Sequence, residues 1–279
     1  MSLVGVIGGS GVYKLDGFNI VKEHEVETPF GKPSDKVLEA QADGKTFFFL
    51  PRHGRTHSVL PHEVNYRANI FALKSLGVDV IVSVSAVGSL KEEHAPTHFV
   101  LPDQFIDWTK GKRERSFFGN GVVAHVSTAE PICLNLQSRL AEHCEQIDVE
   151  YHKGGSYICI EGPQFSSKAE SAIYRSFGAN VIGMTNVPES YLAKEAGISY
   201  ATVAMVTDYD CWKEEHCTVE EIMKVMHKNN STAQELLKRV LPDLYARPIE
   251  VIKENKNAIM TPVEAMTEEQ KKWVEVLTR

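Results

Sequence analysis

The stretch Ala201-Thr202-Val203-Ala204-Met205-Val206-Thr207-Asp208-Tyr209-Asp210 decides the fold. Its first seven residues carry no charge and are typical of a strand that is buried in a parallel sheet. Open α/β sheets bind ligands just beyond the carboxyl ends of their strands. Asp208 and Asp210 fall at that place, and continued strand geometry would put both side chains on the same side. The stretch therefore predicts an α/β sheet with a ligand site at this edge.

The two carboxyl groups allow two interpretations. Like charges so close together raise the pKa of at least one group, toward proton donation near neutral pH. Alternatively, Asp208 is the N-cap of a helix and Asp210 belongs to a solvated turn. The stretch alone favours neither interpretation, so the rest of the chain has to decide.

Short apolar runs alternate with amphipathic stretches over most of the 279 residues. This pattern predicts one α/β domain, residues 1–279, with a twisted, mostly mixed or parallel central β-sheet that is flanked by helices. Residues 247–279 are expected to form a linker and a final helix over 268–277, packed near the active site or against a neighbouring subunit. The predicted strands are 3–7, 46–50, 78–84, 99–101, 157–160, 181–183 and 198–207, and the predicted helices are 64–76, 134–145, 168–177, 189–195 and 219–241.

Composition excludes several classes of protein. A net charge of −7 and a pI near 5.9 argue against a general nucleic-acid binder. No apolar run approaches the roughly 20 residues that span a bilayer, and the chain runs into its first strand without a cleavable segment. Five scattered cysteines with no CxxC pair indicate reduced thiols in a cytoplasmic protein and no metal site.

Three loops at predicted strand ends carry groups that bind anions. The glycines of residues 8–11 turn backbone N–H groups outward around Ser10, although a plain tight turn explains them equally well. Arg52 and His53 follow an apolar strand, where the planar guanidinium group suits phosphate or carboxylate. A solvated basic loop is the alternative for this pair. Ser85 belongs to a third strand end, and its hydroxyl is a common anion or sugar ligand.

Two further strand ends add an aromatic side chain and polar groups. Phe165 follows Gly162-Pro163 and either packs at a helix start or presents a face to a planar ligand. Thr185 follows another buried strand, and Glu189 stands in the first turn of the next helix, where it matches the helix dipole. Together these ends hold what is needed to bind phosphate, a sugar and a heterocyclic base.

The chain resembles the 5'-methylthioadenosine phosphorylases of the trimeric purine nucleoside phosphorylase family over residues 4 to about 241. The resemblance rests on many ordered matches and fades after Pro242. The matches are Gly-Gly-Ser-Gly at 8–11, Thr-Pro-Phe-Gly-Lys-Pro-Ser-Asp at 28–35, Arg-His-Gly-Arg at 52–55, Asn-Tyr-Arg-Ala-Asn at 65–69, Asp-Gln-Phe-Ile-Asp at 103–107, Ala-Glu-Pro at 129–131, Glu-Gly-Pro at 161–163 and Thr-Asp-Tyr-Asp-Cys-Trp-Lys-Glu at 207–214.

The resemblance implies phosphorolysis of 5'-methylthioadenosine in methionine and purine salvage by a homotrimer in the cytoplasm, and in the nucleus as a second location. It implies no cofactor, because inorganic phosphate is a co-substrate. The catalytic residues would be Asp208 and Asp210, which meet adenine N7 and N6. Phosphate would be held by Ser10, Arg52, His53, Ser85, Ala86 and Thr185. The nucleoside would contact Phe165, Ile182, Met184, Val219 and Ile222, with His125 supplied by a neighbouring subunit.

Two positions depart from the family pattern. Ser85 stands where relatives often have Thr, and Gly183 stands where the human-type enzymes have Asn. Two alternative functions remain open at this point. A purine nucleoside phosphorylase would act on inosine, guanosine or adenosine, and a non-catalytic protein would only bind nucleosides.

Overall fold

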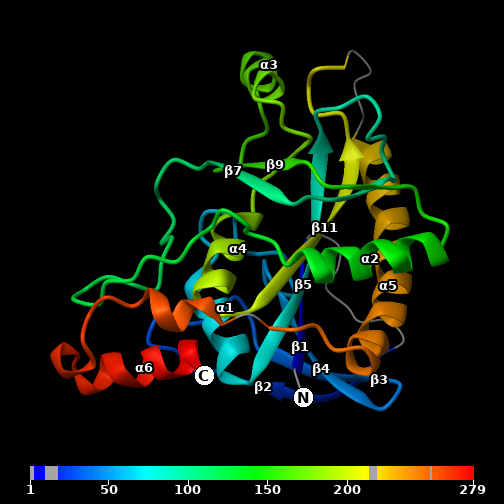
Figure 1. Ribbon diagram of the computed structural model, residues 1–279. Helices are drawn as coiled ribbons and strands as arrows, with labels where there is room; N and C mark the ends of the chain where they lie inside the picture. Colours follow the sequence, from blue (N-terminus) through cyan, green and yellow to red (C-terminus); the bar gives the residue numbers. More distant parts are fainter. Residues whose placement is uncertain (1–2, 10–17, 214–218, 252) are drawn as a thin grey trace.

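The computed structural model describes residues 3–9, 18–213, 219–251 and 253–279. The chain forms three layers, in which α1 and α4 cover one face of a central sheet and α2 and α5 cover the other (Figure 1). The strands are β1 (Leu3–Gly8), β2 (Asn19–His24), β3 (Val37–Ala42), β4 (Lys45–Pro51), β5 (Val78–Ser89), β6 (Phe99–Leu101), β7 (Gln104–Trp108), β8 (Tyr151–Lys153), β9 (Ser156–Ile160), β10 (Val181–Gly183) and β11 (Ser199–Asp208). The helices are α1 (Tyr66–Ser75), α2 (Leu134–Gln146), α3 (Lys168–Ser176), α4 (Asn186–Glu195), α5 (Val219–Ala246) and α6 (Glu268–Thr278), with 3-10 turns η1 (Glu254–Ala258) and η2 (Val263–Ala265).

The sheet is mixed, as predicted, and the predicted α/β fold class is confirmed. Its main path runs β2-β3-β4-β1-β5-β10-β9-β7, while β11 pairs with β5 and β6, and β6 also pairs with β8. All seven predicted strands are present. The prediction missed β2, β3, β7 and β8. Strand β2 is solvent-exposed along almost its whole length, so it carries no apolar run that would mark it.

Strand β5 is the hub of the sheet and leaves one stretch of its edge open. Strand β1 pairs with it in parallel as far as Ser83, and β10 joins the same edge in antiparallel fashion only at Gly88. The carbonyl group of Val84 points to this edge, because it accepts a hydrogen bond from Arg52. Backbone groups point to the same edge at every second residue, so the N–H group of Ala86 faces it too. The sheet thus opens a cleft over residues 84–87.

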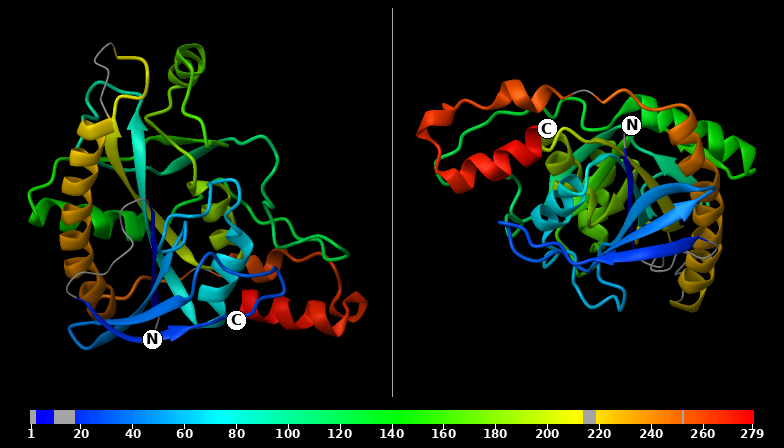
Figure 2. Two further views of the ribbon diagram at one scale, coloured as in Figure 1. Left: turned by 180° about the vertical axis from the view of Figure 1, so that it is seen from behind. Right: turned by 90° about the horizontal axis from the view of Figure 1, so that it is seen from below.

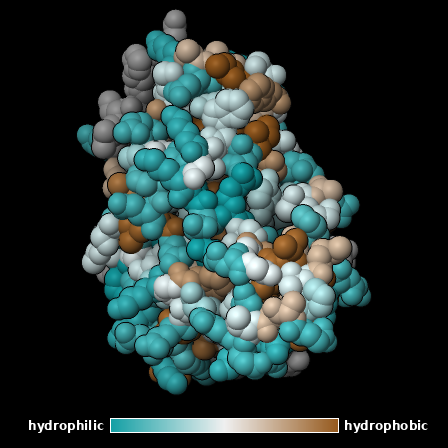
Figure 3. Space-filling view, turned by 90° about the vertical axis from the view of Figure 1, so that its left-hand side faces the viewer, coloured by the Kyte–Doolittle hydropathy of each residue, from teal (hydrophilic) through white to brown (hydrophobic). Residues whose placement is uncertain are grey.

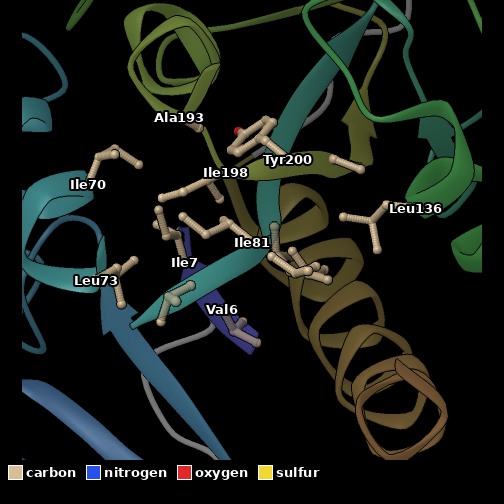
Figure 4. Packing of buried hydrophobic residues seen from close by; sticks show 14 of the residues in the cluster. Val6, Ile7, Ile70, Leu73, Ile81, Leu136, Ala193, Ile198 and Tyr200 are labelled. Atoms are coloured by element: carbon tan, nitrogen blue, oxygen red, sulfur yellow. The ribbon is translucent and has the colours of Figure 1, made fainter. Parts of the chain in front are cut away.

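The core packs against both faces of β5 and β11. In Figure 4, Ile70 and Leu73 of α1 approach β1 and β5 from one side, while Leu136 of α2 lies on the other side. These three side chains and Ile81 of β5 are completely buried. Burial of each such aliphatic side chain stabilises the fold by roughly 1.5–3 kcal/mol. This packing fixes the position of β5 and β11, whose ends hold the predicted site residues.

The C-terminal segment packs against its own chain. Helix α6 begins at a capping box of Thr267 and Gln270, and its Trp273 ring lies 5.8 Å from that of Phe30. The Arg279 side chain donates hydrogen bonds to two backbone carbonyls at the end of α1. The start of β1 and the end of α6 therefore lie at the same end of the molecule, opposite α3 (Figure 2). Helix α6 thus packs on α1 of its own chain, and the expectation that residues 247–279 lie near the active site or against a neighbouring subunit stays a prediction.

Among the described residues, no helix combines the length and the apolar character needed to span a membrane. The described part of the chain also contains no group of three or more His, Cys, Asp or Glu side chains arranged to hold a metal ion.

Candidate active site

A cavity of about 360 Å³ opens at the uncovered edge of β5. Its walls come from the loop after β4, from β5, from the loop after β9, from the end of β10 and from the end of β11. Ten of the predicted site residues line it: Arg52, His53, Ser85, Ala86, Phe165, Ile182, Met184, Thr185, Asp208 and Asp210. The structure therefore brings five of the six predicted phosphate residues and the acid pair to one cavity.

Four predicted residues are not placed in this cavity. Ser10 lies outside the described residues, as do the side chains of Val219 and Ile222. His125 does not line the cavity of its own chain. It lies in an exposed loop, where its backbone N–H group donates to the carbonyl of Ala258 at 3.0 Å.

Arg52 is completely buried, and its guanidinium group is largely occupied by another side chain. Its Nε and Nη2 atoms donate to the two carboxylate oxygens of Glu189, at 2.6 and 2.8 Å. Nη2 also donates to Ser83 Oγ at 2.7 Å, and Nη1 donates to the carbonyl of Val84 at 3.1 Å. Within the described part of the chain, these bonds use four of the five N–H groups of Arg52 and leave one for a ligand. The predicted planar contact between Arg52 and phosphate is thus replaced by a planar contact with Glu189.

Glu189 is a buried ion-pair partner in this structure. We predicted a residue that only matches the dipole of its helix, yet its side chain is 1% exposed. Besides Arg52, it accepts hydrogen bonds from Tyr200 Oη and Ser83 Oγ, both at 2.8 Å. Burial alone would lower the pKa of Arg52, but the Glu189 carboxylate raises it overall. The pair contributes almost no net charge to the cavity, and its two hydrogen bonds fix the orientation of the Arg52 guanidinium group.

His53 has a defined tautomer. A carbonyl can only accept a hydrogen bond, so Nδ1, which lies 2.8 Å from the carbonyl of Val59, carries the proton. Burial and the neighbouring Arg52 charge lower the pKa of His53 to about 4. The neutral ring then offers Nε2 as an acceptor. We predicted a further donor here; the neutral tautomer instead suits an anion that carries a hydroxyl group of its own.

This lowered pKa predicts acid sensitivity of the fold. As the pH falls from 6.5 to about 4, the unfolded chain takes up a proton at His53 before the folded chain does, so stability is lost in that window. The loss is roughly 3 kcal/mol by pH 4. A His53→Asn variant keeps a donor for Val59 but does not titrate. We expect the free energy of unfolding of this variant, measured in urea at several pH values, to fall by roughly 3 kcal/mol less than that of the wild type between pH 6.5 and about 4. Parallel pH profiles of the two proteins would contradict the assignment.

Two hydroxyl groups complete this end of the cavity. Ser85 Oγ and Thr185 Oγ1 lie 3.3 Å apart, and both side chains are almost completely buried. Ser85 comes from the open edge of β5, and Thr185 precedes the first turn of α4. Among the described residues, both hydroxyl groups have only neutral partners, including a long contact of 3.4 Å from Ser85 Oγ to the carbonyl of Ala86, so both can turn their protons toward an anion. With the N–H group of Ala86, they make a cradle of neutral donors.

The acid pair forms the other end of the cavity. Asp208 ends β11, and its two carboxylate oxygens accept from Thr207 Oγ1 at 2.7 Å and from the Asp210 N–H at 2.8 Å. Burial raises the pKa of Asp208, and the Asp210 carboxylate adds to the rise. The predicted continuation of the strand is wrong, because Asp210 has a left-handed φ of 51°. The turn nevertheless brings both side chains to the cavity, where Gly88 leaves room for them.

The remaining wall is apolar and includes an exposed ring. Phe165 is 82% exposed at the mouth of the cavity, where a planar ligand would cover it. Ile182 lies in β10, and Met184 comes directly after the end of that strand; both side chains line this wall. Arg113 holds this wall in place, since its Nη1 donates to the carbonyls of Met184 and Val187 at 2.7 and 2.8 Å. The sequence prediction missed Arg113, whose local sequence is an ordinary charged loop.

Other lining residues also escaped prediction. Residues 57–61 form a wall directly after Arg52 and His53, and their closeness to that pair is the signal that could have found them. Met226 comes from α5, with no local motif around it. The lining residues without a predicted role are His57, Ser58, Val59, Leu60, Pro61, Val87, Gly88, Ile160, Pro163, Ser166, Gly183, Thr207 and Met226.

Comparison with known proteins gives consistent relatives. The family model of the Phosphorylase superfamily matches residues 3–242 of this chain. An S-methyl-5'-thioadenosine phosphorylase of Geobacter sulfurreducens is 52% identical over 241 residues, covering 86% of this chain and 84% of the relative. The enzyme of the same name from Thermosynechococcus vestitus is 48% identical over 268 residues, which cover 94% of this chain and 92% of the relative.

Solved structures agree in fold over almost the whole chain. A methylthioadenosine phosphorylase sourced from an Antarctic soil metagenomic library superposes with a TM-score of 0.94, at 44% identity, over 100% of this chain and 99% of that one. The methylthioadenosine phosphorylase of Schistosoma mansoni, solved in complex with adenine, has a TM-score of 0.88 at 38% identity. The match covers 95% of this chain and 100% of that one. The chain therefore belongs to the phosphorylase superfamily and, within it, to the family of the S-methyl-5'-thioadenosine phosphorylases.

Proposed function

We propose that this protein is a 5'-methylthioadenosine phosphorylase. Inorganic phosphate attacks C1' of the nucleoside, the bond between C1' and N9 breaks, and adenine and 5-methylthio-α-D-ribose 1-phosphate leave. One observation carries the proposal: a single cavity holds anion-binding groups around Ser85 and a protonatable carboxyl group at Asp208. Residues 85–88 of β5 connect the two ends and span about 10 Å, which leaves room for a ribose between them.

The charges that develop during glycosidic cleavage match these two ends. Positive charge builds on the ribose, and an anionic nucleophile held next to C1' stabilises it. Negative charge builds on the leaving purine, and protonation at N7 removes it. Burial raises the pKa of Asp208, which favours the protonated form that can donate to N7. The exposed ring of Phe165 faces the adenine in this arrangement, and Met184 packs on the ribose.

Asp208 also favours adenine over 6-oxopurines. A protonated carboxyl group donates to N7 through its hydroxyl and accepts from the exocyclic amine through its other oxygen. A 6-oxopurine presents an acceptor at that position, which requires an amide donor. Activity on inosine or guanosine is the competing function, and this acceptor mismatch disfavours it.

The decisive experiment measures release of the free base with and without phosphate. We expect adenine to appear from 5'-methylthioadenosine only when phosphate is present, and inosine to react far more slowly. Comparable rates with inosine would replace the proposed substrate with 6-oxopurine nucleosides. Absence of any phosphate-dependent release would favour a protein that only binds nucleosides.

We further propose that the protein works as a cytoplasmic homotrimer with shared active sites. His125 lies in an exposed loop and does not line the cavity of its own chain, which supports its supply to a substrate by a neighbouring subunit. Three exposed apolar side chains lie on β7 and around α3: Trp108, Ile173 and Phe177. The face in Figure 3 is largely hydrophilic but carries several hydrophobic patches, some of them near its upper end. Such patches suit contact between subunits.

The trimer predicts an effect of His125 on the 5' substituent. A neighbour's loop over the sugar pocket would bury the methylthio group, which favours it over hydroxyl by roughly 1–3 kcal/mol. We expect His125→Ala to reduce the preference for 5'-methylthioadenosine over adenosine, in ratios of kcat/KM. Light scattering that shows a fully active monomer of about 31 kDa would overturn both the shared site and the loop's role. An unchanged preference in a trimeric variant would contradict only the role of the loop.

A further inference from the structure

We propose that Arg113 is a positioning residue of the reaction: from behind the cavity, it fixes the short segment that touches both reactants, Met184 and Thr185. The inference rests on the proposed function, which places the ribose against Met184 and the phosphate against Thr185. In the described part of the chain, Arg113 does not belong to the cavity lining. It acts through the backbone of residues that do line the cavity.

The segment after β10 has an irregular backbone. Thr185 has φ −132° and ψ −25°, and Val187, inside the bounds of α4, has non-helical angles of φ −117° and ψ 126°. A break of this kind deprives backbone carbonyl groups of the regular partners that a helix supplies. Two consecutive residues of the segment, Met184 and Thr185, line the cavity. Their placement therefore depends on a partner from outside the segment.

Arg113 is that partner. Its side chain is 1% exposed, and its Nη1 atom donates to the carbonyl groups of Met184 and Val187, at 2.7 and 2.8 Å. These two carbonyl groups flank Thr185 and Asn186 in the chain. One nitrogen atom thus holds the backbone on both sides of Thr185, whose side chain belongs to the cavity lining.

The other donors of Arg113 connect this segment to the end of β9. Nη2 donates to the carbonyl groups of Ile160 and Glu161, at 3.2 and 2.8 Å, and Nε donates to the Glu161 carboxylate at 2.7 Å. All five N–H groups of the guanidinium group are therefore used. The pairing of β9 with β10 ends at Cys159 and Gly183. Arg113 joins the two chain segments where this backbone pairing stops.

A tyrosine connects Arg113 to another wall of the cavity. The central carbon of the guanidinium group lies 5.5 Å from the centre of the Tyr66 ring, and Tyr66 is almost completely buried. Tyr66 Oη donates to the carbonyl group of Pro61 at 2.8 Å. Pro61 belongs to the wall that residues 57–61 form. Through Tyr66, Arg113 therefore connects this wall with the walls that follow β9 and β10.

Position matters in this reaction because separate groups bind the two reactants. Attack on C1' requires a phosphate oxygen about 3–3.5 Å away, and a displacement of about 1 Å can lower the rate by about a hundredfold. Two other groups of the site, Ser85 and Asp208, stand on β5 and β11. A shift of the backbone at Met184 and Thr185 relative to these strands would misalign both reactants with the acid.

The main test is Arg113→Lys, which keeps a positive charge beside Glu161. An ammonium group has three donors at one point, so it cannot hold carbonyl groups of separate segments as the planar guanidinium group does. We expect kcat at saturating phosphate and nucleoside to fall by between about ten- and a hundredfold. Each KM should change by a smaller factor, because the groups that contact the substrates remain. A wild-type kcat, or a loss confined to the KM values, overturns the proposal.

Two further variants separate positioning from stability. Arg139→Lys is the matched control, because Arg139 of α2 donates to the Asp243 carboxylate at 2.8 Å and to the carbonyl group of Arg247 at 3.0 Å; it should keep the wild-type kcat. An equal loss of kcat in this control overturns the proposal. Glu161→Gln keeps Arg113 and its bonds to backbone carbonyl groups but weakens the anchor at Nε, so kcat should fall by a smaller factor. If Arg113→Lys does not fold, a wild-type kcat in Glu161→Gln overturns the proposal.

Hydrogen exchange without any ligand separates the role of Arg113 from the proposed function. The amide groups of residues 184–187 should exchange faster in Arg113→Lys than in the wild type, because the segment opens more readily. Arg139→Lys should exchange there as the wild type does. If the wild type releases no adenine yet the three proteins show this pattern, the proposed function fails while the hold of Arg113 on the segment stands. If the wild type is active and exchange at residues 184–187 is equal in all three, the role of Arg113 alone fails.

Discussion

Replacement of Asp208 by Asn is expected to lower the turnover of 5'-methylthioadenosine by at least one to two orders of magnitude, the usual contribution of a general acid. The amide cannot give up a proton to N7, while its size leaves the cavity unchanged. The measurement is kcat at saturating phosphate and nucleoside. Wild-type-like turnover would refute the role of Asp208 as the acid. A partial gain of activity on inosine would support its role in base selection, since an amide can donate to O6.

The pH profile provides the control for this variant. Asp208 works as an acid only while it is protonated, and burial raises its pKa above the ordinary value for an aspartate of about 4. The wild-type kcat should therefore decline as the pH rises through that pKa. The residual activity of Asp208→Asn should lack this decline, because the amide does not titrate. A decline of equal steepness in both proteins would show that another group supplies the proton.

Removal of Arg52 is expected to damage the protein in two ways. Arg52→Ala leaves the Glu189 carboxylate buried without its partner, which typically costs about 3–5 kcal/mol of stability. The variant also loses the Arg52 side chain from the lining of the cavity, so the KM for phosphate should rise more than that of the nucleoside. The two effects are read from urea denaturation and from the two KM values. A stable Arg52→Ala protein, or equal changes in both KM values, would contradict this account.

A double variant separates stability from phosphate binding. Arg52→Met with Glu189→Gln removes both charges and keeps much of the buried volume, so most of the lost stability should return. Phosphate binding should not return with it, because methionine has no donor. Glu189→Gln alone is the matched comparison: it keeps the Arg52 charge but weakens the hold on its orientation. Recovery of the wild-type KM for phosphate in the double variant would exclude Arg52 from the site.

The sequence predicts what is local and misses what the fold brings together. The apolar run before Asp208 predicts both β11 and the acid pair, because burial on both faces leaves a continuous uncharged stretch. Arg52 was recognised as suited to an anion, but its partner Glu189 lies 137 residues further along the chain. No local pattern can report such a pairing. The left-handed backbone of Asp210 was likewise missed, since non-glycine residues seldom adopt it.

The same limit explains one further error. The role of Glu189 was underestimated because its position in a first turn gave a sufficient local reason for an acidic residue. Prediction from local patterns is thus most reliable at strand ends and least reliable for side chains that a distant element neutralises.

The open edge of β5 makes part of the anion site insensitive to mutation. An N–H group that belongs to the backbone persists whichever side chain position 86 carries, and only proline removes it. Side-chain ligands such as Ser85, in contrast, can be lost by a single base change. A lineage can therefore exchange serine for threonine at the rim, or lose a hydroxyl for a time, without losing its hold on the anion altogether. Because this stretch of the β5 edge is left open, its backbone N–H group stays available to the anion when the side-chain ligands change.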